Sequence, residues 1–136
     1  MSHAVALDQG NPAAAIRAYA PEGVHRIVEV SLSDNADLDN AVVANGTVIA
    51  AYATSADRTE MPSWPLLFNN VILRLIGSDD FPEEAKRQAA RDLTAAAAVG
   101  ALTVEVGDRY ELADIAKAHD RVDAGSRGRV LATLPQ

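Results

Sequence analysis

The chain has 136 residues, 49% of them hydrophobic and 23% charged, with 12 basic against 19 acidic side chains and a formal net charge of −7. This length suits one globular domain with a buried core, and the absence of cysteine excludes disulfides, thiolate metal sites and cysteine nucleophiles. The acidic balance argues against a nucleic-acid partner, and no apolar run or signal-peptide pattern points to a membrane, so we expect a cytoplasmic protein.

Strands and helices are predicted to alternate along the chain. In chain order we expect a strand at 3–7, a helix at 12–20, a strand at 26–30, a polar loop at 31–35, a helix at 37–44, a strand at 47–53, a loop at 54–65, a strand at 71–77, a helix at 82–99, a strand at 102–106, a helix at 112–124 and a strand at 129–134. The strands are assigned from β-branched and alternating apolar runs, and the helices from start signals, stop signals and helical spacing. This alternation favours an α/β fold with a mainly parallel sheet.

Two boundaries carry specific signals. Asn11 followed by Pro12 predicts a helix start, because Asn accepts hydrogen bonds from the first turn and Pro loses none at the first helical position. This first helix is expected to bury Ile16 and Tyr19. Gly46, after Asn45, is expected to take the left-handed conformation that ends a helix without steric cost.

Five blocks of sequence occur in the order and spacing of one family. They are 25–30 (HRIVEV), 45–52 (NGTVIAAY), 64–74 (WPLLFNNVILR), 106–119 (VGDRYELADIAKAH) and 128–131 (GRVL). Together they resemble the C-terminal portion of a zinc-independent NADPH:quinone oxidoreductase of the medium-chain dehydrogenase/reductase superfamily. The resemblance covers nearly the whole chain.

The resemblance implies a partial, three-layer Rossmann-like fold in which 26–30, 47–53 and 71–77 are strands 4, 5 and 6 of the doubly wound order. Residues 1–100 would form a nucleotide-binding domain without its first two strands, and 101–136 would be a strand-helix-strand segment that returns to the catalytic domain. The eight glycines show no G-x-G-x-x-G spacing after a strand, so the turn that cradles the cofactor phosphates is absent. The edge of strand 26–30 would be open and would need cover.

Candidate ligand-binding residues follow from this topology, because ligands bind beyond the carboxyl ends of the strands in open α/β sheets. By resemblance, the loops after the second and third strands face the ribose and nicotinamide, and a basic residue near the C-terminus faces the cofactor phosphates. The implied NADPH-binding residues are Tyr52, Ala53, Thr54, Ser55, Gly77, Ser78 and Arg129. The alternative is that these loops are ordinary polar connections and that Arg129 is a solvated side chain at the start of a strand.

Other conspicuous side chains have structural interpretations. His119 is expected to be a half-buried packing residue, and the three histidines lack metal-ligand spacing, so no metal site is predicted. The acidic pairs at 79–80 and 83–84 suit the N-terminus of a helix. Trp64 and Phe68 lie in a segment that resembles the family's dimer-forming edge, and we expect them to be buried at a subunit interface.

Two functions are left open. The first is the cofactor-binding part of an oxidoreductase that transfers hydride from NADPH to a quinone or an enone. Without the phosphate cradle, this chain alone is expected to bind NADPH weakly or not at all and to be inactive or nearly so. The second is a non-catalytic interaction module, in which strand 71–77 pairs with its copy across a two-fold axis. The expected partner is therefore a second copy of the chain or a separately encoded N-terminal half.

Overall fold

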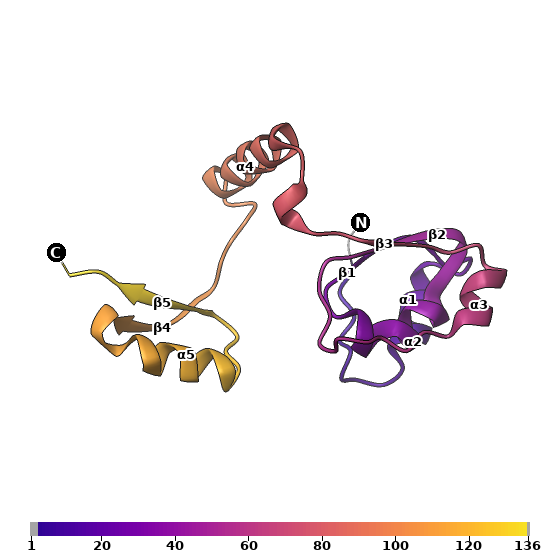
Figure 1. Ribbon diagram of the computed structural model, residues 1–136, viewed down its shortest axis with the longest axis horizontal. Helices are drawn as coiled ribbons and strands as arrows, with labels where there is room; N and C mark the ends of the chain where they lie inside the picture. The colour runs from indigo at the N-terminus through magenta and orange to yellow at the C-terminus, as the bar shows by residue number, and fades with distance from the viewer. Residues whose placement is uncertain (1–2, 136) are drawn as a thin grey trace. The chain divides into compact units, whose positions relative to one another are not determined.

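The computed structural model describes residues 3–135, except for the side chain of Ser78. The chain divides into two compact units at the boundary between Phe81 and Pro82, and Figure 1 shows their elements. The boundary predicted at residue 100 is of another kind, because it separates the parts that would belong to two different domains of a full-length relative. It stays a prediction.

The first unit is built on a three-stranded parallel sheet. Its strands are β1 (Val24–Glu29), β2 (Val43–Ala51) and β3 (Ile72–Leu75), in the order β1-β2-β3. The register aligns Ile27 with Ile49 and Ile49 with Leu73. These strands and their order confirm the predicted part of the Rossmann sheet.

Three helices belong to this unit: α1 (Pro12–Tyr19), α2 (Leu32–Val42) and α3 (Ser63–Phe68). Helices α1 and α2 lie on the same side of the sheet (Figure 1). The core on this side consists of Leu32, Val43, Ile49, Ala51 and Leu66. Val28, which alternates to the other face, is 73% exposed, so within this unit one face of the sheet is covered better than the other.

Helix α1 starts as its sequence predicts, because the Asn11 side chain accepts a hydrogen bond of 3.0 Å from the backbone N–H of Ala14. We expected α1 to bury Ile16 and Tyr19. Ile16 is half-buried, but the prediction is wrong for Tyr19, which is 61% exposed. The Tyr19 ring stacks instead on His3, with 3.8 Å between the ring centroids. Gly46 has the expected positive φ of 77°, but it does not end a helix, because α2 ends at Val42 and Gly46 lies within β2 (Val43–Ala51).

Three predicted segments of the first unit also differ from the structure. Residues 3–7 form no strand, because a strand needs a hydrogen-bonded neighbour and the described sheet begins at β1. The segment 31–35 is no loop: α2 begins at Leu32, which packs into the core. The segment 54–65 was predicted to be all loop, but α3 begins inside it.

The second unit contains a long helix and a strand-helix-strand segment. The elements are α4 (Glu83–Ala98), β4 (Val106–Glu111), a short 3₁₀ turn at Leu112–Asp114, α5 (Ile115–Asp123) and β5 (Arg129–Thr133). A second 3₁₀ turn, at Ser78–Asp80, belongs to the first unit. Strands β4 and β5 pair in parallel and α5 packs against both. The backbones approach closely at Gly128, where an added Cβ would lie 2.6 Å from the Gly107 nitrogen.

Two expectations for this segment are corrected. The strand predicted at 102–106 begins at Val106 instead, where backbone pairing with β5 starts. His119 is exposed, not half-buried, because the residue that α5 buries is its neighbour Ala118. The predicted helices at 82–99 and 112–124 and the strand at 129–134 are confirmed with small shifts of their ends.

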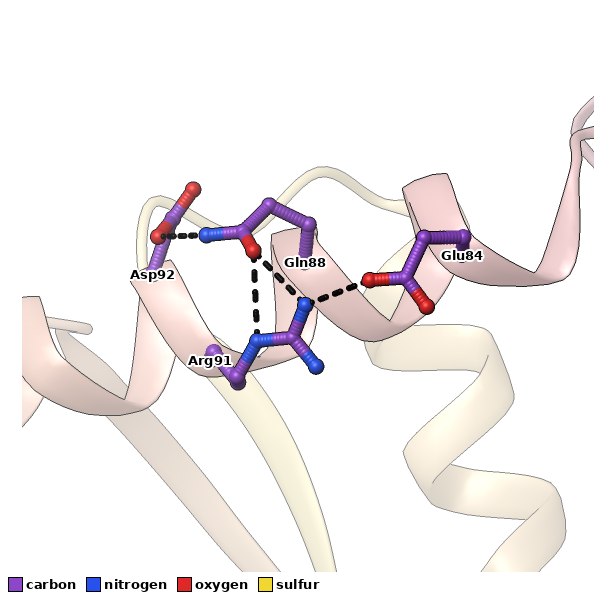
Figure 2. Close-up of polar contacts among 4 residues, drawn as sticks. All are labelled: Glu84, Gln88, Arg91 and Asp92. Carbon is purple, nitrogen blue, oxygen red and sulfur yellow. Dashed lines mark hydrogen bonds and ion pairs between the residues drawn. The ribbon is translucent and has the colours of Figure 1, made fainter.

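Helix α4 carries a polar network along its exposed surface (Figure 2). Arg91 donates to Glu84 at 2.8 Å and to Gln88, and Gln88 donates to Asp92 at 2.7 Å. The pairs spaced by three or four residues stabilise the helix itself by a few tenths of a kcal/mol each, and the Glu84–Arg91 pair spans two turns of the same helix. The network therefore explains the polarity of the helix without a ligand.

None of the helices in the described part of the chain combines the length and the apolarity needed to cross a membrane.

Candidate functional site

A cavity of about 570 Å³ opens beyond the carboxyl ends of β2 and β3. The residues that follow these strand ends, Tyr52 and Ile76, contribute to its wall. The cavity therefore lies where open parallel sheets bind their ligands, and its volume falls in the range typical of small-molecule sites.

The wall combines apolar and polar groups. Leu32, Ala51, Leu73, Leu75, Ile76 and Met61 supply apolar surface, and Tyr52, Thr54, Asp57 and Thr59 supply oxygen atoms. The first group can contact an apolar face of a ligand, and the second can exchange hydrogen bonds with its polar groups. The arrangement suits a ligand with both parts.

The loop that lines the cavity is fastened to the turn between β1 and α2. The backbone N–H of Tyr52 donates to the Glu29 carbonyl at 3.1 Å, and that of Leu32 donates to the Ala53 carbonyl at 3.2 Å. These two hydrogen bonds extend the pairing of β1 and β2 past the strand ends. The shape of the turn therefore fixes where the cavity wall begins.

Hydroxyl groups continue this attachment. The backbone N–H groups of Ser55 and Ala56 both donate to the Ser33 hydroxyl at 3.2 Å, and the Ser55 hydroxyl donates to Asp34 at 2.7 Å. Hydrogen bonds from Ser31 and Ser55 lower the pKa of Asp34. The first turn of α2 thus holds the loop after β2 by side-chain as well as backbone contacts.

The structure brings four of the predicted site residues together. Tyr52, Ala53, Thr54 and Gly77 line the cavity, whereas Ser55 faces the first turn of α2. The backbone of Ser78 begins the short turn Ser78–Asp80, and its side chain lies outside the description. Arg129 is exposed in the second unit, where it lines a groove with Arg127 and Ser126.

Several lining residues were missed by sequence reasoning. Asp57, Thr59 and Met61 come from the segment treated as a plain connection, and Leu32 from the supposed polar loop before α2. The signal for Leu32 was present: Leu32, Ala36 and Val42 fall on one face of a helix that starts five residues earlier than predicted. The loop residues carried no periodic signal.

Among the residues that the structure describes, no group of three or more histidine, aspartate or glutamate side chains is placed to hold a metal ion.

Comparison with known proteins places this fold. The sequence matches no family model and no curated protein. Among solved structures, a quinone oxidoreductase of Pseudomonas syringae pv. Tomato DC3000 has 15% identity and a TM-score of 0.73, and the match covers 95% of this chain and 41% of that one. CurA of Vibrio vulnificus, solved with NADPH, has 15% identity and a TM-score of 0.71, with 96% and 42% covered.

A mycobacterial protein solved with NADPH has 26% identity and a TM-score of 0.70, and the match covers 88% of this chain and 38% of that one. The chain thus spans about two fifths of the length of these structures. The predicted resemblance is confirmed at the level of the fold, which this chain shares with part of a solved quinone oxidoreductase and part of a putative alcohol dehydrogenase.

Proposed function

We propose that the first unit is the cofactor-binding part of an NADPH-dependent oxidoreductase that reduces a quinone or an enone, and that its cavity receives the nicotinamide and the adjoining ribose. The observation that carries this proposal is the cavity beyond the ends of β2 and β3. Two of the solved structures with this fold are NADPH complexes, which supports the same cofactor here.

The residues present fit one end of the cofactor. The apolar wall suits the nicotinamide ring, and the hydroxyls of Thr54 and Thr59 suit the ribose. No Gly-rich phosphate turn occurs in the sequence, so the diphosphate lacks the backbone cradle that such a turn provides. When bound, the cofactor supplies the hydride, and the chain's contribution is to orient the ring and exclude water from it.

A binding experiment separates the two ends of the cofactor. Reduced nicotinamide mononucleotide is titrated into the ¹⁵N-labelled chain, and adenosine 2′,5′-bisphosphate is titrated into a second sample. We expect the mononucleotide to shift the backbone amide signals of Tyr52, Ala53 and Gly77 at millimolar concentrations. We expect the bisphosphate to shift none of them, because the sequence has no Gly-rich turn that would present backbone N–H groups to its phosphates.

The variant Gly77→Val tests the location. Gly77 lies outside the left-handed region, and apart from its two chain neighbours no residue has an atom within 4 Å of the position of an added Cβ. We therefore expect valine to be accommodated there and to reduce the space in the cavity. Ala101→Val, at an exposed position of the second unit, is the control. The variant should lose the mononucleotide shifts and the control should keep them. Shifts that persist in Gly77→Val, or a bisphosphate that binds at the same residues, would contradict the proposal.

The second candidate function is self-association of the chain. It is favoured by exposed apolar side chains on α3 and on β3. Trp64 and Phe68 are 69% and 70% exposed and stack with 5.9 Å between ring centroids. Leu67 on α3 and Leu75 on β3 are also exposed. Strand β3 is a border strand of the described sheet. We propose that two copies pair through β3 and bury these aromatic rings. A separately supplied N-terminal half, which would cover the open edge of β1, is the alternative partner.

Sedimentation equilibrium tests the self-association. The wild-type chain should sediment as a dimer at about 100 μM, and the double variant Trp64→Ser, Phe68→Ser should sediment as a monomer, because aromatic anchors dominate such interfaces. Tyr19→Ser removes another exposed aromatic ring, from α1, and should leave the dimer intact. A monomeric wild-type chain at this concentration would rule out pairing through β3.

A further inference from the structure

Two buried carboxyl groups lie between β1 and α2. Glu29, the last residue of β1, is 5% exposed, and Asp39, on the sheet-facing side of α2, is 4% exposed. Asn35, whose side chain donates to Glu29 Oε1 at 3.0 Å, lies one helical turn before Asp39 on α2, so the Glu29 and Asp39 carboxyl groups are neighbours on this face. Charged carboxylates are rarely buried so completely, and two of them side by side cannot both ionise at low cost.

The two carboxyl groups differ in their hydrogen bonds: Glu29 accepts two, whereas Oδ2 of Asp39 has none. Glu29 Oε1 accepts from the backbone N–H of Ser31 and from Asn35 Nδ2, at 3.0 Å in the second case. The buried Oδ2 of Asp39 receives no hydrogen bond from any described residue. A proton on Asp39 resolves both features, because the acid then donates to the Glu29 carboxylate instead of facing it as a second anion.

No cation on the neighbouring elements neutralises the pair. On α1, Arg17 gives its N–H groups to the carbonyls of Pro21, Ala41 and Val43. Strand β2 has no titratable side chain. None of the ion pairs in the described part of the chain includes Glu29 or Asp39.

The remaining charged groups near the pair are distributed as follows. Strand β1 also carries His25 and Arg26, both exposed, and α2 carries Asp34 and Asp37, both exposed. Burial, followed by the neighbouring Glu29 charge, raises the pKa of Asp39 to about 7. Geometry and electrostatics therefore agree on a protonated Asp39 at mildly acidic pH.

We propose that Glu29 and Asp39 share one proton and act as positioning residues, holding the β1–α2 turn in the shape that fastens the cavity loop. Glu29 acts on the turn through the Ser31 N–H and Asn35. The same turn binds the loop through the Glu29 carbonyl, which accepts from Tyr52, and through the Leu32 N–H, which donates to Ala53. Loss of the proton places two negative charges in the buried site and loosens this attachment.

The test follows single atoms as the pH changes and needs no ligand, so its failure is separate from failure of the proposed function. The ¹³C signal of the Asp39 carboxyl should titrate near neutral pH. The amide signals of Ser31, Leu32 and Tyr52 should shift with the same midpoint. In Asp39→Asn, whose amide donates permanently to Glu29, these amide shifts should disappear, while Asp37→Asn, on the exposed side of α2, should retain them.

Two results would overturn the inference. An Asp39 carboxyl that titrates below about pH 5, as an ordinary aspartate does, would show that the pair shares no proton. Amide shifts of Ser31 and Tyr52 that are the same in Asp39→Asn and in the wild-type chain would show that the turn responds to another group. The carboxyl titration is measured on the wild-type chain, so it stands even if a variant folds poorly.

Discussion

The variant Asp39→Asn is predicted to change how the stability of the first unit depends on pH. The pKa of Asp39 rises from its usual 3.8 to about 7 in the folded chain. Because the folded state then holds a proton that the unfolded state releases, the wild-type chain is favoured below about pH 4 and loses stability as the pH rises toward 7. At roughly 1.4 kcal/mol per pKa unit, the loss is at most about 4 kcal/mol.

Asparagine has the shape of protonated aspartate and no charge to lose. We therefore expect Asp39→Asn and the wild-type chain to have similar free energies of unfolding at pH 4, and the variant to be more stable by up to about 4 kcal/mol at pH 8. Sharing of the proton with Glu29 makes this figure an upper bound.

The single tryptophan, Trp64, lies in α3 and reports on the first unit by its fluorescence. Urea unfolding followed in this way at several pH values gives the free-energy difference between the two chains at each. Titrating groups that the substitution does not affect contribute equally to the free energy of unfolding of both chains. Their contributions therefore cancel in the difference between the two chains. If the two free energies stay parallel from pH 4 to pH 8, folding does not raise the pKa of Asp39 and the reasoning is wrong.

Two further substitutions test how the elements are held. Arg17→Ala removes three hydrogen bonds that the guanidinium donates to the carbonyls of Pro21, Ala41 and Val43. The variant should lower the free energy of unfolding by about 2–4 kcal/mol in the same fluorescence assay. A change under about 0.5 kcal/mol would show that these hydrogen bonds do not hold the elements together. Gly128→Ala places a Cβ 2.6 Å from the Gly107 nitrogen, so β4 and β5 should separate and their amide protons should exchange rapidly, whereas unchanged protection would show that the strands can shift to admit a methyl group.

The sheet was predictable because its strands are short apolar runs with a local signal. Ile27, Ile49 and Leu73 sit in β-branched or leucine-rich segments, and their order in the sheet followed from the resemblance to a doubly wound fold. The start of α2 was less accessible, since Ser31 and Ser33 give the turn a polar composition that hides Leu32. Alternation identifies elements well, but it places their ends poorly where core and surface residues are interleaved.

The run at 3–7 shows the limit of local propensity. Its apolar composition predicted a strand, but a strand is stable only with a partner that satisfies its backbone groups, and the described residues provide none. Helix α3 shows the converse. Pro65 suggested a loop, yet it occupies the first turn of the helix, where a proline removes no helical hydrogen bond.

The sequence predicted the part of the candidate site that follows the strand ends, but not the carboxyl pair. Tyr52, Ala53, Thr54 and Gly77 follow strand ends, so topology alone directs them to one edge of the sheet. The carboxyl pair obeys no such rule. Glu29 ends a strand and Asp39 lies on the following helix, and each looks like a solvated charge until the helix is placed so that Asp39 shares a face with Leu32, Ala36 and Val42.

A charged residue among these apolar neighbours has a local cost that folding has to offset elsewhere. The structure offers two ways to reduce it: the Ser31 N–H and Asn35 stabilise charge on Glu29, and the buried site favours a neutral Asp39. Both act on the turn that holds Tyr52 and Ala53. A hydrophobic residue at position 39 would fill the space without the pH dependence, so a stable Asp39→Leu chain whose Tyr52 amide signal no longer responds to pH would assign that response to the shared proton rather than to packing.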